Sequence, residues 1–254
     1  MSTSRLFGLI GNPLSHSFSK AYFEEKFISE KIRDAEYREF PLVKVSELPE
    51  LIANEPNLVG LNVTIPHKQD IMNFLDEVDS VANDVGAVNT VVVSRDEDDQ
   101  KVVSLKGYNT DVKGFEHSLV PMLSAEHSAA LILGSGGAAR AIIFVLKKLG
   151  IEYQVVSRTP TGGRSIGYDE LNEETMGANT LIINSSPVGM EPNTDAAPNI
   201  PYEYLNSAHL LYDLIYNPVE TEFLRRGKAA GATTKNGLEM LNIQAEKSWD
   251  IWSS

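Results

Sequence analysis

One segment constrains the fold of this chain more than any other, because it joins an apolar run, a glycine-rich turn and an amphipathic stretch without interruption. The apolar run is Ala129–Leu133, the turn reads GSGGAAR from Gly134 to Arg140, and a helical pattern continues to Leu149. Glycines allow the tight turn and the close approach of a pyrophosphate, whose charge is favoured by the free N–H groups of the following helix. The segment predicts the first strand, turn and helix of a dinucleotide-binding domain.

The glycine spacing determines which residues we expect against the cofactor. Ala139 takes the third position of the G-x-G-x-x-G pattern, where a small residue allows close helix packing. On this motif alone, an ordinary structural turn remains the alternative. The expected pyrophosphate contacts are Gly134, Ser135, Gly136, Gly137 and Ala138.

The end of the next expected strand decides between the two nicotinamide dinucleotides. An NAD-binding chain places Asp or Glu there, about 20 residues after the glycines, to bind the ribose 2′-hydroxyl. This chain has Ser157, Arg158 and Thr159 instead. A guanidinium can stack on the adenine and bind a 2′-phosphate through two hydrogen bonds, and Thr159 and Arg164 can add hydrogen bonds or charge. The sequence therefore favours NADP.

Short apolar runs alternate with amphipathic stretches along most of the chain, which predicts an α/β fold. Strands are expected at 6–11, 35–40, 59–63, 87–93, 102–106, 129–133, 153–157, 180–184 and 209–213. Helices are expected at 19–29, 46–54, 66–74, 76–84, 111–119 and 237–252, and another from the end of the glycine turn at Arg140 to Leu149. In the helix at 237–252, apolar residues recur at helical spacing, so we expect it to pack back on the N-terminal part.

Composition excludes several classes of protein. The 22 Lys and Arg stand against 35 Asp and Glu, so the net charge is −13. A nucleic-acid partner is not expected, because binding phosphates needs an excess of basic residues. The absence of Cys removes disulfides and thiolate metal sites. The apolar run at 6–10 is too short for a signal peptide or a membrane span, so we expect a soluble cytoplasmic protein.

Polar residues cluster where the expected N-terminal strands end. Ser17 and Ser19 lie at an expected helix start, where the helix dipole favours a carboxylate, although an N-cap would explain one of them. The strand at 59–63 delivers Asn62 and Thr64 to one side. The helix start that follows returns Lys68 nearby, although a lone Lys is usually a solvated charge.

Two further polar groups follow the same pattern. Asn89 lies in an expected strand, within the segment GAVNT. Asp111 offers a carboxylate at the first turn of the next helix, where capping is the simpler explanation.

Taken together, the segments resemble the shikimate dehydrogenases, which are NADP enzymes that reduce 3-dehydroshikimate in aromatic amino-acid biosynthesis. The matching segments, in chain order, are GNPLSHSFS, NVTIPHK, GAVNT, GYNTD, GSGGAAR, SRT, NSSPVGM, YDLIYNP and NGLEMLNIQA. They span nearly the whole chain, and NVTIPHK with GYNTD is highly specific. Ser157 departs from the family, which usually has Asn there.

The resemblance implies a role for each matching residue. Lys68 and Asp111 match the catalytic pair. The hydroxyls that hold the substrate carboxylate are matched by Ser17 and Ser19, helped by Tyr216. Groups that bind the ring hydroxyls are matched by Asn62, Thr64, Asn89 and Gln244, and positions lining the nicotinamide by Met190 and Gly237.

The resemblance also implies two domains. We expect residues 1–108 with 238–254 to form a substrate-binding α/β domain with a mixed sheet. Residues 109–237 should form a Rossmann-like, doubly wound NADP-binding domain.

Two other functions stay open at this point. One is a quinate/shikimate dehydrogenase that uses NAD(P), which Arg158 disfavours. The other is a non-catalytic ligand sensor, which the presence of Lys68 and Asp111 disfavours. No metal site is expected, because the five histidines lack ligand spacing. The sequence leaves both a monomer and a homodimer possible.

Overall fold

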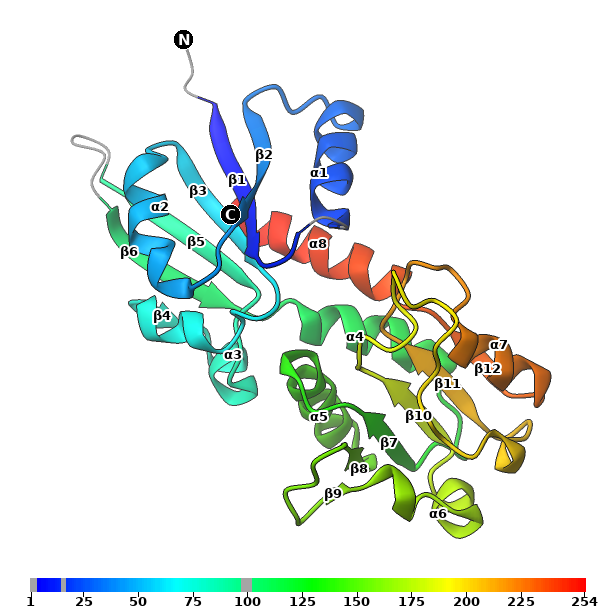
Figure 1. Ribbon diagram of the computed structural model, residues 1–254. Coiled ribbons are helices and arrows are strands. Elements are labelled where there is room, and N and C mark those ends of the chain that lie inside the picture. Colours follow the sequence, from blue (N-terminus) through cyan, green and yellow to red (C-terminus); the bar gives the residue numbers. More distant parts are fainter. Residues whose placement is uncertain (1–3, 15–16, 97–101) are drawn as a thin grey trace. The chain divides into compact units, whose positions relative to one another are not determined.

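The computed structural model describes residues 4–14, 17–96 and 102–254 (Figure 1). The segments Ser15–His16 of the serine motif and 97–101 lie outside the described residues. The chain divides into two compact units. Unit 1 comprises Met1–Thr110 and Ala245–Ser254, and unit 2 comprises Asp111–Gln244.

Unit 1 is built on a six-stranded mixed sheet. Its strands are β1 (Arg5–Gly11), β2 (Ala35–Pro41), β3 (Leu58–Val63), β4 (Glu77–Val78), β5 (Thr90–Arg95) and β6 (Val102–Tyr108). They lie in the order β2-β1-β3-β5-β6-β4, with β5 antiparallel to both of its neighbours and the other pairs parallel. The mixed sheet agrees with the prediction.

Helices cover both faces of this sheet. They are α1 (Phe18–Ser29), α2 (Leu48–Asn54), α3 (Ser80–Val85) and the C-terminal part of α8 (Leu238–Trp252), with 3₁₀ turns at Val45–Glu47 and Asp70–Phe74. Successive strand residues point to opposite faces. Leu6 and Ile10 of β1 therefore pack with α2, whereas Phe7 packs with Phe23 of α1 and Trp252 of α8.

Two predicted helices of unit 1 are wrong. The stretch 66–74 forms turns and only a 3₁₀ segment, because its groups bond to other parts of the chain: the Lys68 carbonyl accepts from the Val88 amide at 2.7 Å, and the His67 ring bonds the Leu42 carbonyl at 2.7 Å. The stretch 76–84 contains β4 and then α3, whose N-terminus is capped by the Asp79 side chain. The strand predicted at 87–93 begins only at Thr90.

Unit 2 contains a six-stranded parallel sheet. Its strands are β7 (Ala129–Leu133), β8 (Glu152–Val156), β9 (Ser165–Ile166), β10 (Leu181–Asn184), β11 (Leu210–Asp213) and β12 (Thr233–Lys235). They lie in the order β12-β11-β10-β7-β8-β9, and every pair is parallel. Counted within the unit this is the order 6-5-4-1-2-3, which is the doubly wound Rossmann topology. The predicted fold class is confirmed.

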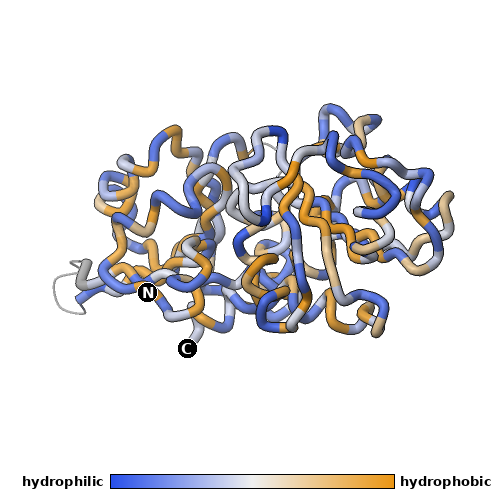
Figure 2. The backbone as a smooth tube through the Cα atoms, turned by 90° about the horizontal axis from the view of Figure 1, so that it is seen from below, coloured by the Kyte–Doolittle hydropathy of each residue, from blue (hydrophilic) through white to orange (hydrophobic). Residues whose placement is uncertain are grey.

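The α-helices of unit 2 are α4 (Asp111–Leu119), which precedes the sheet, and α5 (Gly137–Leu149), α6 (Glu173–Ala178) and α7 (Glu222–Ala229), which connect its strands. There are 3₁₀ turns at Val120–Met122, Tyr168–Glu170 and Tyr202–Tyr204. Figure 2 shows the resulting alternation of apolar and polar stretches along the backbone. None of the helices in the described part of the chain is both long and apolar enough to cross a membrane.

Candidate active site

The start of α1 presents a buried hydroxyl. Ser17 is the N-cap residue, but its side chain makes no capping hydrogen bond. Its Oγ is buried and has no hydrogen-bond partner among the described residues. The first turn of α1 carries no acidic side chain. A buried hydroxyl at the positive end of a helix suits an anionic ligand group, as the sequence predicts.

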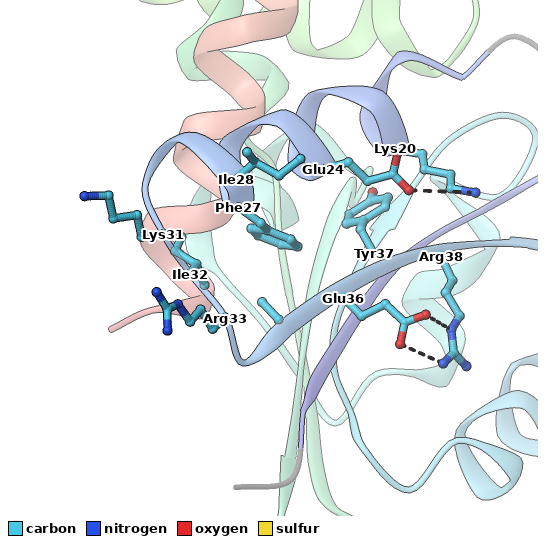
Figure 3. Close-up of a pocket in the computed structure, with 11 residues that line it drawn as sticks. Lys20, Glu24, Phe27, Ile28, Lys31, Ile32, Arg33, Glu36, Tyr37 and Arg38 are labelled. Carbon is cyan, nitrogen blue, oxygen red and sulfur yellow. Dashed lines mark hydrogen bonds and ion pairs between the residues drawn. The ribbon is translucent and has the colours of Figure 1, made fainter.

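Asn62, at the end of β3, is held by neighbours that the sequence analysis did not identify. The Tyr37 hydroxyl donates to Asn62 Oδ1 at 2.8 Å, and Asn62 Nδ2 donates to Ser248 Oγ at 3.0 Å. Ser19 lies half-buried in the first turn of α1, near the same Tyr37 hydroxyl. Burial raises the pKa of Tyr37 well above its usual value, so this hydroxyl stays protonated. Tyr37, which projects from β2 toward α1 (Figure 3), thus orients one predicted ligand-binding residue, Asn62, and lies near a second, Ser19.

The neighbouring residues Val88 and Asn89 hold two other segments of unit 1. Asn89 Oδ1 accepts from the Thr110 amide at 2.7 Å, and Asn89 Nδ2 donates to Thr110 Oγ1 at 2.9 Å. Its neighbour Val88 donates to the Lys68 carbonyl at 2.7 Å. The consecutive residues Val88 and Asn89 therefore anchor the backbone at Lys68 and at the residue that precedes Asp111.

Thr64 and Lys68 lie in the turn that follows β3. The Thr64 amide donates to the Ile10 carbonyl at 2.9 Å, and the Thr64 carbonyl accepts from His67 at 3.0 Å. Both Thr64 and Lys68 are half-buried. A Cβ at Gly11 would collide with the Thr64 methyl group, so β1 approaches this turn closely.

The other predicted residues of the substrate site belong to unit 2. Asp111 is the first residue of α4 and is buried. Tyr216 follows β11 and is half-buried. Gln244 is buried on α8, and its Nε2 donates to the Leu241 carbonyl at 3.0 Å. The predicted catalytic pair is thus divided, with Lys68 in unit 1 and Asp111 beginning unit 2.

The glycine turn of unit 2 has the conformation that the motif predicts. Gly134 has φ +114°, and a Cβ there would lie 3.1 Å from Ser185 Oγ, so the position favours glycine twice over. Gly136 is the N-cap of α5, and no side chain caps that helix start or places an acid in its first turn. The amides of this turn therefore offer an anion site at the carboxyl end of β7.

Arg158 follows β8 and lies at the carboxyl ends of the strands, where doubly wound sheets bind their ligands. Its side chain is exposed and makes no hydrogen bond or ion pair with any described residue. Ser157 and Thr159 shape the turn around it, since the Thr159 amide donates to Ser157 Oγ at 3.2 Å. The guanidinium is available for an anion such as a 2′-phosphate.

Arg164 does not lie beside Arg158. Its Nη1 bonds Glu152 Oε2 at 2.6 Å and the Tyr153 carbonyl at 3.3 Å, and its guanidinium lies over the Tyr153 ring. Glu152 begins β8, so the Arg164 head group points to the amino end of the strand. The expected contribution of Arg164 to a phosphate site is not supported by this arrangement.

A polar cluster joins the ends of β10 and β11, and the sequence analysis missed it. Asn184 Nδ2 donates to Asp213 Oδ1 at 3.0 Å, as does the Ile215 amide, and Thr221 Oγ1 donates to Asp213 Oδ2 at 2.5 Å. Burial raises the pKa of Asp213 to about 6 despite these donors. Polar residues that end two otherwise apolar strands were the available signal.

The two positions expected near the nicotinamide also lie in unit 2. Met190 is exposed in the loop after β10. Gly237 precedes α8, and its amide donates to the Ile215 carbonyl at 3.1 Å. A Cβ at Gly237 would collide with the Leu214 carbonyl, which explains the glycine.

Comparison with known proteins identifies relatives of this chain. A sequence profile of the shikimate dehydrogenase substrate binding domain matches residues 9–91. The NADP(+) shikimate dehydrogenase of Methanococcus maripaludis is 37% identical over 268 residues, which cover 99% of this chain and 93% of that protein.

Two solved structures share the fold over nearly the whole chain. Shikimate 5-dehydrogenase from Thermus thermophilus, in complex with NADP(H) and shikimate, has a TM-score of 0.81 and 31% identity, covering 98% of this chain and 93% of that one. Quinate dehydrogenase from Corynebacterium glutamicum, in complex with NAD, has a TM-score of 0.84 and 26% identity, covering 99% and 94%.

Proposed function

The chain belongs to the shikimate dehydrogenase family, and on that premise we propose that it catalyses the reversible NADPH-dependent reduction of 3-dehydroshikimate to shikimate. It is an NADP-dependent oxidoreductase of the shikimate pathway, which leads to chorismate and the aromatic amino acids. Unit 1 binds the substrate and unit 2 binds NADP.

One geometric observation carries this proposal. The two-residue segment Val88–Asn89 anchors both the backbone of Lys68 and the backbone of Thr110, which immediately precedes Asp111. The sequence separates Lys68 from Asp111 by more than forty residues, yet hydrogen bonds of 2.7 Å tie both segments to one point. Such anchoring supports a pair that works on one substrate carbonyl and its neighbouring hydroxyl.

The cofactor and the side chains of the protein contribute different parts of the proposed reaction. NADPH supplies the hydride that reduces the carbonyl carbon. Lys68 donates a proton to the carbonyl oxygen and stabilises the charge that develops there, and in the reverse direction it accepts that proton. Asp111 orients the Lys68 ammonium group and binds a neighbouring ring hydroxyl.

Other side chains hold the two ligands. The Ser17 and Ser19 hydroxyls bind the substrate carboxylate with help from Tyr216. The ring hydroxyls are bound by Asn62, Thr64, Asn89 and Gln244. The cofactor is held by Gly134, Ser135, Gly136, Gly137 and Ala138 at the pyrophosphate, by Ser157, Arg158 and Thr159 at the adenosine phosphate, and by Met190 and Gly237 at the nicotinamide.

The decisive experiment is a spectrophotometric assay with shikimate or quinate against NADP or NAD. The proposal expects strong activity only with shikimate and NADP. Activity with quinate or NAD would assign the chain to the broader quinate/shikimate branch. No activity in any combination would leave a ligand-binding protein without catalysis.

We further propose that the protein works in the cytoplasm with small molecules as ligands. The net charge of −13 supports this, because a surface with such an excess of acidic groups repels nucleic acids and anionic membrane surfaces.

A further inference from the structure

Asp213, at the end of β11, is a completely buried carboxylate to which the proposed reaction gives no role. Among the described residues it forms no ion pair, and its hydrogen bonds come from uncharged donors. Oδ1 accepts from Asn184 Nδ2 and from the Ile215 amide, both at 3.0 Å, and Oδ2 accepts from Thr221 Oγ1 at 2.5 Å. Burying a carboxylate without a cation beside it is costly, so these donors have to hold it. They come from the end of β10 and from the loop between β11 and α7.

The first donor, Asn184, holds the loop that leads to Met190. Asn184 Oδ1 accepts from the Ser186 amide at 3.1 Å and from Ser186 Oγ at 2.7 Å. Its Nδ2, which bonds Asp213, also donates to the Val188 carbonyl at 3.3 Å. One side chain thus binds this loop at two points shortly before Met190, and the Asp213 carboxylate determines which way the Asn184 amide is turned.

The second donor, Ile215, connects Tyr216 to Gly237. The Ile215 amide bonds Asp213, and the Ile215 carbonyl accepts from the Gly237 amide at 3.1 Å. A Cβ at Gly237 would collide with the Leu214 carbonyl, so the two backbones are in contact. Tyr216 is the next residue after Ile215. A change at the Asp213 carboxylate therefore reaches both Tyr216 and Gly237 through one residue.

The third donor, Thr221, joins the loops after β10 and β11. It is the N-cap of α7, and its Oγ1 accepts from the Leu224 amide at 3.4 Å while it donates to Asp213. Its side chain also lies against the loop after β10, because a Cβ at Gly189 would be 3.6 Å from Thr221 Cβ. Asp213 therefore ties the two loops to each other as well as to the sheet.

The strand order shows which half of a dinucleotide lies at this cluster. The strands β11, β10, β7 and β8 are consecutive in the sheet (Figure 1). The glycine turn follows β7 and Arg158 follows β8, whereas Asp213 and its donors lie at the ends of β10 and β11. Neighbouring strands are about 4.8 Å apart, so β11 is roughly 14 Å from β8. A dinucleotide with its pyrophosphate at β7 and its adenosine at β8 has its nicotinamide on the β10 side.

We propose that Asp213 is a positioning residue for the nicotinamide half of the cofactor. It acts through the two loops, whose ligand-binding residues are Met190 and Tyr216, and through the contact of Ile215 with Gly237. The inference rests on the proposed function, from which it takes the roles of these residues. Hydride transfer needs the donor and acceptor carbons in contact, and a displacement of about 1 Å can lower such a rate about 100-fold.

Asp213→Ala removes the carboxylate, and measurements on the full chain locate the effect. A single turnover of NADP with saturating shikimate and excess enzyme, followed by NADPH absorbance, measures hydride transfer without product release. This rate should fall at least about tenfold. NADP affinity should fall about tenfold, whereas the affinity for 2′,5′-ADP, which has no nicotinamide, should stay within about twofold. Asp213→Asn keeps one oxygen for Asn184 and Ile215, so its rate should stay within about threefold of the wild type.

Two further positions separate positioning from stability. Thr221→Val removes one donor with little change in side-chain size and should slow hydride transfer at least about threefold, whereas Thr221→Ser keeps the hydroxyl and should match the wild type. His209→Ala is the matched control. His209 is also buried and lies immediately before β11, at the opposite end of the strand, where its Nε2 bonds the Met176 carbonyl at 3.1 Å. This variant should unfold at lower urea concentration, followed by circular dichroism, with an unchanged rate of hydride transfer.

The outcomes distinguish this inference from the proposed function. A wild type that reduces NADP with neither shikimate nor quinate overturns the proposed function, and with it the roles on which the inference rests. With an active wild type, a rate that stays within about twofold in the folded variants Asp213→Ala and Thr221→Val overturns the inference alone, as does an equal loss of NADP and 2′,5′-ADP affinity. Equal slowing in His209→Ala would show that any loss of stability in unit 2 slows the reaction, and it would overturn the inference as well.

Discussion

At the scale of single residues, a predicted ligand-binding side chain of unit 1 is held in its orientation by neighbouring side chains. Tyr37 is a buried aromatic residue on an edge strand, yet its hydroxyl donates to Asn62. It therefore determines which way the Asn62 amide is turned, with Oδ1 toward Tyr37 and Nδ2 toward Ser248.

Tyr37→Phe tests this orientation of Asn62. The ring remains stacked on Phe23, but Asn62 Oδ1 loses its donor. We expect KM for shikimate to rise about tenfold, equivalent to about 1–2 kcal/mol, with kcat and KM for NADP changed much less. Steady-state kinetics measure both, with the exposed Tyr204→Phe as control. Equal losses in kcat and in both KM values would indicate only a structural role.

Lys68→Ala tests the proposed proton donor. Removing a general acid typically lowers turnover by about 10²–10⁴-fold, whereas the groups that bind the ring remain. We expect kcat to fall by that factor while calorimetric titration still detects shikimate binding. Lys228→Ala removes an exposed lysine of α7 and should have no effect. A kcat within tenfold of the wild type would remove Lys68 from the mechanism.

Arg158→Ala tests the choice of cofactor. A charged hydrogen-bonding group contributes about 1.5–3 kcal/mol, so NADP affinity should fall about 10- to 100-fold while NAD affinity stays the same. Arg164→Ala is the matched control, because that side chain is already paired with Glu152. Fluorescence titration with each nucleotide measures both constants. Equal losses for NADP and NAD would exclude binding of the 2′-phosphate by Arg158.

At the scale of elements, a polar cluster lies at the carboxyl ends of β10 and β11, two otherwise apolar strands. Asn184 and Asp213 are opposite each other in the strand register and are hydrogen bonded. Asp213 accepts hydrogen bonds from three donors, but burial still dominates and raises its pKa to about 6. The two strand ends are thereby joined at the edge where a doubly wound sheet binds its ligand.

This raised pKa gives a testable dependence of stability on pH. Because the folded protein binds the Asp213 proton more tightly than the unfolded chain does, stability from this group is present below pH 4 and is lost as the pH rises toward 6. The shift from 3.8 to about 6 corresponds to about 3 kcal/mol. Asp213→Asn has no carboxyl group to ionise and does not lose this stability. The difference in the free energy of unfolding between the variant and the wild type should therefore shift in favour of the variant by about 3 kcal/mol between pH 4 and pH 7.

Urea unfolding at a series of pH values measures the difference. The exposed Asp195→Asn serves as the control and should follow the wild type at every pH. If Asp213→Asn and the wild type depend on pH in parallel, the carboxyl group ionises as readily in the folded protein as in the unfolded chain.

The elements that the sequence predicted well are those with a strong local pattern. β1 and β7 agree closely with their predicted bounds, because apolar runs determine them locally. α5 ends at Leu149 as predicted but begins at Gly137, inside the predicted glycine turn. The stretch 66–74 was predicted as a helix, but tertiary hydrogen bonds at His67 and Lys68 hold it as a turn. The short strands β9 and β12 and the helices α6 and α7 were missed, because they depend on neighbours distant in the sequence.

At the scale of the whole molecule, a chain with a net charge of −13 must bind two anionic ligands. Many of its cations are neutralised by nearby carboxylates, as Arg225 and Arg226 are by Glu222. Arg158 is exposed and has no such partner among the described residues. The groups that can bind an anion, namely a cation, backbone amides and a buried hydroxyl, are therefore found at a few places. The negative net charge describes the remaining surface.

The two tryptophans offer a way to follow one unit alone. Trp249 and Trp252 are the only ones in the sequence, and both lie in the part of α8 that belongs to unit 1. Trp252 Nε1 donates to the Val91 carbonyl at 3.0 Å, and its ring lies 5.0 Å from that of Phe7. Indole fluorescence therefore reports on unit 1, whereas nucleotide binding reports on unit 2 under the proposed assignment.

Trp252→Ala should separate the two readouts. The lost packing and hydrogen bond cost about 3–5 kcal/mol in a buried site, so the fluorescence of the remaining Trp249 should show unfolding at much lower denaturant concentration. Shikimate binding should weaken with it, because the same face of the sheet carries α1 and Tyr37. NADP affinity should stay within about twofold, since unit 2 has its own sheet and core. The exposed Val219→Ala should change neither, and a parallel loss of NADP binding in Trp252→Ala would mean that the two units fold as one cooperative body.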